Sequence, residues 1–237
     1  MNKDSFDIYF EFNHSNLNIS VFEKFNNKLK YTKQQSYKSY IENSKELNFD
    51  QLSKLIEENI LEIEKTINYF VNDIYLMIET PESISIKLSV IRNNEGKKIN
   101  KKDATYLIQD AKQQFLKSNF EYSIVHLIIE NYVLDDIEYK YLPSDIDCKK
   151  FSIDVRFICF PKNLTRSFES VFSKQQININ QIICSSYAKN MNLEADNINI
   201  CELGKKIVDG VNKQEVVIIP KKLERTGFFE RLFHLFN

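Results

Sequence analysis

The chain has 237 residues, of which 43% are hydrophobic and 27% are charged, and its formal net charge is −1 at pH 7. This composition is typical of a soluble globular protein of one or two domains, and the balanced charge excludes a general affinity for nucleic acid. The first residues lack the apolar core of a signal peptide, and no apolar run reaches the length of a transmembrane helix, so we expect a protein in the cytoplasm or on the cytoplasmic face of a membrane.

The amino-terminal part predicts a meander of strands followed by a long helix. Three strands separated by turn-forming residues are expected, at 7–12, 16–23 and 28–38. Asn48 can cap the helix that follows, and apolar residues then recur with a helical period from Leu52 to Phe70. The helix therefore carries one apolar stripe, which should face a sheet.

The rest of the chain predicts further strands and two more helices. Strands are expected at 73–79, 84–91, 122–133, 137–142, 150–160 and 177–184, and helices at 102–118 and directly after Pro161. In the stretch 84–91, apolar residues alternate with Ser85, Lys87 and Ser89, which indicates a sheet with one solvated face. The polar residues from Arg92 to Lys102 are expected to form a loop.

The residues themselves predict neither a nucleotide site nor a catalytic site. The four glycines, at positions 96, 204, 210 and 227, form neither G-x-G nor G-x-x-x-x-G-K, the patterns whose backbone amides bind phosphate. The three histidines and four cysteines lie far apart, without a metal-binding or triad pattern. We therefore expect no metal, no cofactor and no catalytic residue, with His126 and the cysteines buried in structural roles.

The carboxyl-terminal residues 227–237 predict a short amphipathic helix. Its apolar side carries the residues that we expect to enter a lipid surface, Phe228, Phe229, Leu232, Phe233 and Phe236. The basic residues expected to attract anionic headgroups are Lys221, Lys222, Arg225 and Arg231. At about 16 Å the helix is too short to span a bilayer. The alternatives are a helix packed on the protein's own core or in the groove of a partner.

Several stretches, taken in order, resemble the bacterial cell-division protein family FtsA, the actin-like adaptors that tie the FtsZ ring to the inner membrane. The stretch from Phe10 to Val21 is similar to the opening hairpin of that family, with Glu11 in place of its Asp and Asn13 in place of its Gly. The other similar stretches are 49–65, 99–103, 163–188 and the closing residues 227–233.

The resemblance implies an α+β fold with a partial actin-like (ribonuclease H-like) subdomain. That first actin-like subdomain would comprise residues 1–82 and 161–200, and an inserted strand-helix-strand-strand subdomain for protein interactions would comprise 83–160. A linker over 201–226 would then lead to the amphipathic membrane-targeting helix at 227–237. By the resemblance, the inserted subdomain would contact partners through the strand 84–91 and the helix 102–118.

The departures from the family determine the expected function. After Met191 the family continues into a second actin-like half, whereas here a short polar segment leads to the tail, so ATP binding and the usual FtsZ-docking subdomain are not expected. The resemblance thus implies a non-catalytic, membrane-peripheral adaptor of cell division at the cytoplasmic face of the inner membrane. Division-ring proteins, FtsZ among them through another surface, and further copies of the chain are its expected partners. The rival hypotheses are a diverged actin-like ATPase and an adaptor of a pilus or secretion platform.

Overall fold

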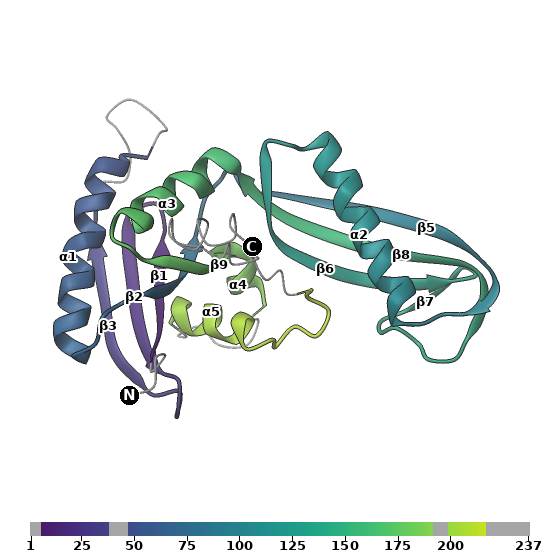
Figure 1. The fold of residues 1–237 in the computed structure, drawn as a ribbon, viewed down its shortest axis with the longest axis horizontal. Helices are drawn as coiled ribbons and strands as arrows, with labels where there is room; N and C mark the ends of the chain where they lie inside the picture. Colours follow the sequence, from purple (N-terminus) through teal and green to yellow (C-terminus); the bar gives the residue numbers. More distant parts are fainter. Residues whose placement is uncertain (1–5, 38–46, 192–198, 217–237) are drawn as a thin grey trace, which may run out of the picture.

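The computed structural model describes residues 6–37, 47–191 and 199–216. These residues form two lobes, each built around one β-sheet, which lie next to each other along the long axis of the molecule (Figure 1). The second lobe is an insertion into the first, because the chain leaves the first lobe after residue 78 and returns to it at residue 161.

The first lobe is organised by a five-stranded mixed sheet with the order β3-β2-β1-β4-β9. Its strands are β1 (Phe6–Phe12), β2 (Asn16–Glu23), β3 (Leu29–Ser36), β4 (Asp73–Ile78) and β9 (Asn178–Cys184). Strand β2 runs antiparallel to both of its neighbours, while β1, β4 and β9 are parallel to one another. The carboxyl ends of these three parallel strands therefore meet at one edge of the sheet.

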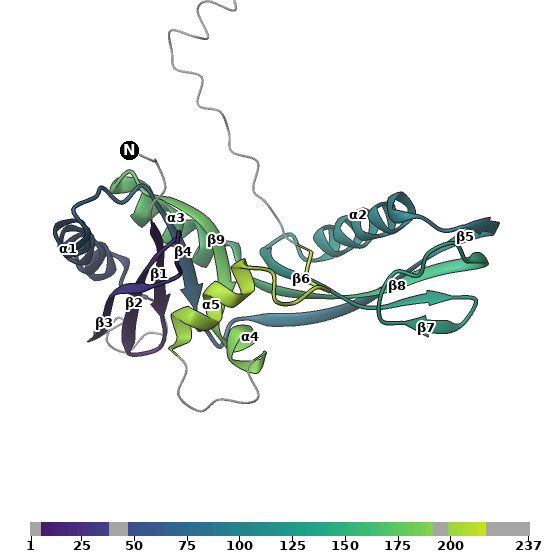
Figure 2. The ribbon, with the colours of Figure 1, turned by 90° about the horizontal axis from the view of Figure 1, so that it is seen from below.

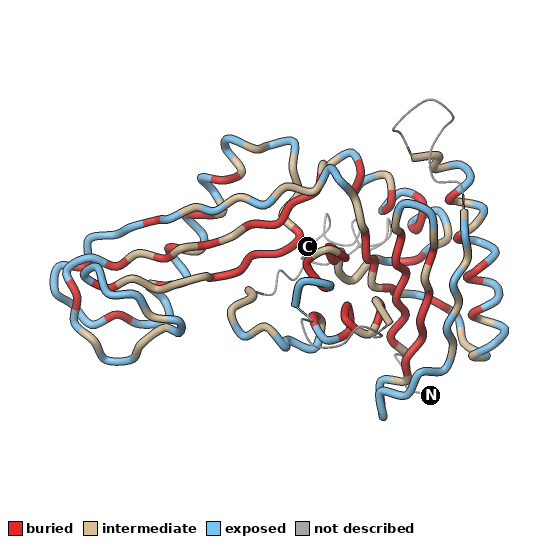
Figure 3. Tube along the Cα trace, turned by 180° about the vertical axis from the view of Figure 1, so that it is seen from behind, coloured by how far each residue is buried: buried red, intermediate tan, exposed pale blue. Residues whose placement is uncertain are grey.

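Helices cover both faces of this sheet. Figure 2 shows α1 (Phe49–Ile67) and α3 (Lys162–Lys174) on one side, and α4 (Ser185–Asn190) and α5 (Ile200–Val208) on the other. Residues 7–12 of β1 are consequently buried on both faces of the strand, and Figure 3 shows buried residues concentrated in the central strands. As predicted, Asn48 caps α1, and its side chain accepts a hydrogen bond from the Gln51 amide at 3.1 Å.

The second lobe is a four-stranded antiparallel sheet with the order β5-β8-β6-β7. It contains β5 (Ile84–Lys98), β6 (Tyr122–Leu134), β7 (Ile137–Tyr139) and β8 (Asp147–Pro161), and α2 (Lys101–Ser118) packs on one face. Side chains of α2 and of the strands form the second of two hydrophobic cores. The first core fills the other lobe and also includes Val125 and Ile128 of β6 and Ile158 and Phe160 of β8.

The stretch predicted as a loop, from Arg92 to Lys102, is mostly strand. Strand β5 continues to Lys98 through an irregularity between Asn93 and Lys97, and α2 begins at Lys101. The buried side-chain amide of Asn94 stabilises the irregularity by donating to the carbonyl of Lys97 and, at 3.3 Å, to that of Cys148. Pairing with β8 thus overrides the low strand propensity of these polar residues.

The expected linker over 201–226 begins with a packed helix instead. Helix α5 buries Cys201, Leu203 and Ile207 against the first sheet. Gly204 permits this close approach, because a Cβ atom at its position would lie 2.3 Å from the sulfur of Met77 on β4. The residues after 216 lie outside the described part of the chain.

The predicted fold class is confirmed. The first lobe has a mixed five-stranded sheet between two layers of helices, the partial actin-like arrangement that was expected, and the second lobe is an inserted subdomain of strands and one helix. The inserted lobe carries one more short strand, β7, beside the end of β6. The amphipathic helix of the prediction, at 227–237, lies outside the described residues.

Candidate functional site

The residues predicted to bind a membrane all lie outside the described part of the chain. They are Phe228, Phe229, Leu232, Phe233, Phe236, Lys221, Lys222, Arg225 and Arg231. Their role therefore stays a prediction. Among the described residues, no helix is both long enough and apolar enough to cross a membrane.

The predicted interaction strand does lie at the edge of an open sheet. Strand β5 is the outermost strand of the second sheet, and Ile84, Ile86 and Leu88 on its α2 side are only half-buried. Ile91 is 66% exposed, and on the neighbouring helix Tyr106 is 60% exposed. Among the described strands, none pairs with this edge, so it presents apolar side chains together with backbone groups that a further strand could use.

The face of this sheet opposite α2 carries a charged network. Glu130 on β6 lies between two cations, with Lys87 Nζ at 2.8 Å and Arg156 Nε at 3.1 Å. On the same face the Ser89 hydroxyl donates to Asp154 at 2.5 Å. The alternation that predicted a solvated face is therefore confirmed, and this face is polar from β5 to β6.

The turn between β1 and β2, the candidate phosphate loop by resemblance, is closed by its own side chain. Asn13 Oδ1 accepts hydrogen bonds from the amides of Ser15 at 3.1 Å and Asn16 at 2.8 Å. The amide of Asn13 donates to the Asn16 carbonyl at 3.1 Å, and Tyr37 donates its hydroxyl proton to the Asn13 carbonyl at 2.8 Å. Amides that could point to a phosphate are thus engaged within the turn.

A buried carboxylate lies directly beside this turn. Glu11 is 1% exposed, and its Oε2 accepts from Asn18 at 2.6 Å and from Asn13 at 3.3 Å. Burial raises the pKa of Glu11, while the hydrogen bond from Asn18 partly opposes that rise. Among the described residues, neither Glu11 Oε1 nor Ser185 Oγ has a hydrogen-bond partner.

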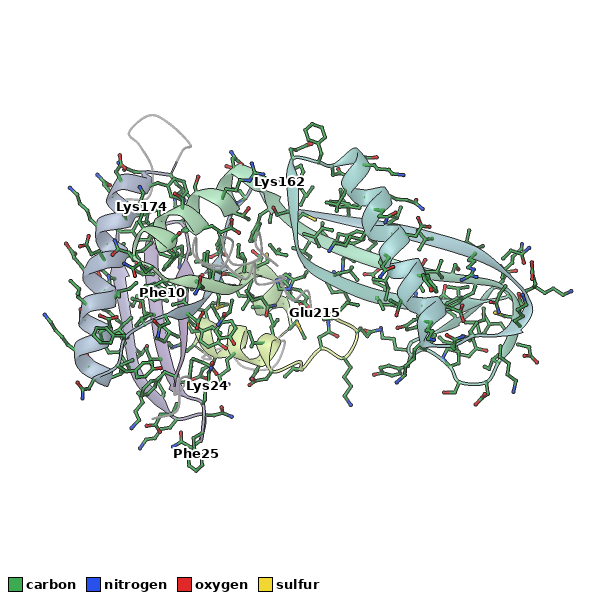
Figure 4. All side chains as sticks on the ribbon, in the orientation of Figure 1. Phe10, Lys24, Phe25, Lys162, Lys174 and Glu215 are labelled. Carbon is green, nitrogen blue, oxygen red and sulfur yellow. The ribbon has the colours of Figure 1, made fainter. Side chains whose placement is uncertain are left out.

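A polar cluster joins the two lobes, and the sequence did not predict it. His126 on β6 is completely buried, with Nδ1 at 2.6 Å from Glu215 Oε1 and Nε2 accepting the Cys184 amide at 2.9 Å. Because Nε2 is an acceptor, the ring proton lies on Nδ1 and is donated to Glu215. Tyr187 donates its hydroxyl proton to the other oxygen of Glu215 at 2.8 Å. Figure 4 shows Glu215 in the region between the lobes.

The backbone next to Glu215 extends the second sheet. The Ile129 amide donates to the Gln214 carbonyl at 2.9 Å, and the Val216 amide donates to the Leu127 carbonyl at 2.8 Å. The segment that immediately precedes the tail is therefore fixed to β6 by its backbone and to both lobes by Glu215. The structural role predicted for His126 is confirmed, since both ring nitrogens have partners.

The four cysteines are free and buried, as expected. Burial raises the pKa of the thiols of Cys159 and Cys201 to about 12, so both stay protonated at neutral pH. Among the described residues, no group of three or more acidic, histidine or cysteine side chains could hold a metal ion. These thiols therefore act as small apolar core groups.

Comparison with known proteins gives similarity at the level of structure. No family model and no curated protein matches the sequence. The cytoplasmic domain of EpsL, an inner membrane component of the type II secretion system of Vibrio cholerae, is 9% identical over 78% of this chain and 57% of its own, with a TM-score of 0.37. The PilM-PilN type IV pilus biogenesis complex is 11% identical over 79% of this chain and 50% of that chain, with a TM-score of 0.46.

A third similar structure is a Bacteroides thetaiotaomicron protein of actin-like ATPase fold and unknown function. It is 9% identical over 81% of this chain and 59% of its own, with a TM-score of 0.34. The chain thus spans between 50% and 59% of the length of these three chains. At such identities and scores the similarity concerns the fold alone, and it does not single out the FtsA family.

Proposed function

We propose that this chain is a non-catalytic adaptor that holds protein partners at the cytoplasmic face of a membrane. The main support for the proposal is the edge of β5, with which none of the described strands pairs. Half-buried apolar side chains lie along this edge, next to backbone groups that could pair with another strand. Edge strands in natural proteins are often protected by charges and by irregularities, and β5 has an irregularity after Asn93. Before it, residues 84–93 pair with β8 without interruption, and Lys87 and Arg92 are the cations among them. An extended segment of a partner fits this edge, with backbone pairing giving affinity and alternate side chains giving specificity.

The closed turn at Asn13 supports the non-catalytic part of the proposal. A nucleotide held in an actin-like manner would need backbone amides directed at its phosphates. Here Asn13 Oδ1 accepts the amides of Ser15 and Asn16, and the Glu11 carboxyl group lies beside them. Converting this turn into a phosphate site would therefore break the two hydrogen bonds that Asn13 Oδ1 accepts.

The sequence of the tail supports the membrane part of the proposal. Residues 217–237 contain four basic and two acidic side chains, besides the aromatic side of the predicted helix. Partial burial of several phenylalanines in a lipid interface, combined with headgroup attraction, gives weak binding by one tail. Self-association through the body would place several tails on one particle and strengthen binding without any new contact.

Two assemblies fit an adaptor of this kind, a pilus or secretion platform and the division ring. Two of the three structural neighbours belong to the first kind by their titles, and we propose it as the assembly to test first. The division ring, predicted from the resemblance, stays a prediction. Recovery of the intact chain from its own host with components of one assembly and not the other would decide between them.

Vesicle flotation with the full chain tests the membrane role. The double substitution Phe229→Asp and Phe233→Asp should reduce binding to vesicles of phosphatidylglycerol and phosphatidylcholine about tenfold or more, because two aromatic side chains no longer enter the interface. The double substitution His234→Asp and Asn237→Asp is the matched control, since it adds the same two negative charges on the polar side of the predicted helix and should reduce binding less. Equal flotation of all three chains would contradict the proposal.

A further inference from the structure

A pocket of about 320 Å³ opens in the first lobe next to the connections to the second. Its floor is apolar and consists of Phe12, Phe49, Ile78, Leu164 and Phe168. The rings form one aromatic group, with the centroid of Phe168 at 5.1 Å from Phe12 and at 5.3 Å from Phe49. The volume is at the lower end of small-molecule sites, enough for a few side chains of a peptide.

The polar groups around this pocket are mostly engaged locally. Asn13 closes the β1–β2 turn, Thr80 Oγ1 accepts the amide of Glu82 at 3.2 Å, and Asn163 Oδ1 accepts the amide of Leu164 at 2.9 Å. What remains for a ligand is the apolar floor, the hydroxyl of Ser167 and the exposed carboxylate of Glu82. The carboxylate of Glu79 nearby is held by Lys189 at 2.8 Å. The fitting ligand is therefore apolar or aromatic and carries positive charge nearby.

We infer that this pocket binds the carboxyl-terminal tail of the same chain when the tail is not in lipid. The tail combines the required properties, since four phenylalanines follow Gly227 and basic residues outnumber acidic ones by four to two between 217 and 237. The inference rests on the proposed membrane role, because it makes the pocket and the lipid surface competitors for the same side chains.

The tail is long enough to reach the pocket. It departs from Val216, whose amide is bonded to Leu127 on β6. From Leu127 to Tyr122, which pairs with Pro161 at the start of α3, the strand covers about 17 Å at roughly 3.3 Å per residue. Residues 217–226 can span about 33 Å when extended. This extended length exceeds the part of the path that lies along β6, and the phenylalanines of the tail follow beyond residue 226.

Docking in the pocket would restrain membrane binding. The apparent affinity of the chain for lipid would equal the affinity of a free tail multiplied by the fraction of tails that are outside the pocket. Any change that blocks the pocket would therefore restore the full affinity for lipid. The body would then limit attachment until a lipid surface, or a partner at the pocket, displaces the tail.

A tryptophan in the tail provides a direct test, because the chain contains none. In the full chain carrying Phe229→Trp, acrylamide quenching should be several-fold weaker than for a peptide of residues 217–237 with the same substitution. Adding Ser167→Tyr, which fills the pocket from its half-buried position on α3, should restore quenching to the peptide value. Ser170→Tyr, an exposed position on the same helix that does not line the pocket, is the matched control and should leave the protection unchanged.

Vesicles of phosphatidylglycerol and phosphatidylcholine separate this inference from the proposed function. Tighter vesicle binding by the Ser167→Tyr chain than by the Ser170→Tyr chain supports both. A tryptophan that is protected in the pocket but never captured by vesicles would support the inference and contradict the membrane role. A tryptophan quenched like the free peptide in every chain, yet captured by vesicles, would overturn the inference and leave the membrane role standing.

Discussion

The two lobes differ in how completely their sheets are covered. The first sheet lies between two layers of helices, and residues 7–12 of its strand β1 are all buried. The second sheet has one helix, α2, and its β5 alternates between half-buried apolar residues and exposed Ser85, Lys87 and Ser89. The comparison teaches that the first lobe is the more completely packed frame, whereas the described part of the second lobe leaves one face of its sheet and the edge strand β5 open to solvent.

The largest expected effect is a loss of packing in the frame. Phe168 is 1% exposed and lies between Phe12 and Phe49, so Phe168→Ala should lower the free energy of unfolding by about 3–5 kcal/mol. Tyr106→Ala, on the exposed side of α2, should change it by less than about 0.5 kcal/mol. Urea unfolding measures both. Similar losses of unfolding free energy for the two variants would contradict the distinction between the packed first lobe and the more open second lobe.

The next effect concerns the junction between the lobes. Glu215→Ala would leave the Nδ1 proton of His126 and the hydroxyl of Tyr187 without acceptors, so we expect a loss of roughly 2–3 kcal/mol in unfolding free energy. Small-angle scattering should also show a larger radius of gyration as the lobes separate. Lys213→Ala, an exposed neighbour, is the control. Unchanged scattering and stability would show that the cluster does not hold the lobes together.

A smaller effect, of opposite sign, is expected at Glu11. Burial raises the pKa of Glu11 in the folded state above the ordinary value of 4.5. As the pH rises, Glu11 therefore loses its proton first in the unfolded chain. The folded state is destabilised relative to the unfolded chain as the pH passes from 4.5 through the raised pKa. Glu11→Gln should therefore stabilise the protein at pH 7, by on the order of 1 kcal/mol, and lose this advantage below about pH 4. Thermal unfolding at several pH values measures it. A loss of stability at pH 7 would contradict the account of Glu11.

The smallest effect is expected on the solvated face of the second sheet. The side chain of Lys87 is 70% exposed, and exposed ion pairs contribute roughly 0–1 kcal/mol. Lys87→Ala should therefore leave the unfolding transition almost unchanged in low or high salt. A large destabilisation would mean that this face is not a free surface but part of the core structure.

Local patterns in the sequence predicted much of this fold, but not the contacts between distant segments. The helical period after Asn48 and the alternation from Ile84 to Val90 correspond to α1 and to the first part of β5. The sequence did not predict helix α5, because its apolar pattern is short and is interrupted by Gly204. The helix is stabilised by close packing on Met77, a contact between distant segments.

The junction could not be predicted for a related reason. Glu215 and His126 are 89 positions apart, and neither has a local signal of pairing. Likewise, the hydrogen bonds that close the Asn13 turn became evident only from the geometry, although the replacement of glycine there was visible in the sequence.

The most direct test of the central claim, an adaptor whose frame holds no nucleotide, is calorimetric titration of the full chain with Mg-ATP. Because the amides of Asn13, Ser15 and Asn16 are engaged within the β1–β2 turn, we expect no saturable binding at millimolar nucleotide. Binding in the micromolar range, abolished by a substitution in this turn, would contradict the account and favour a diverged ATPase.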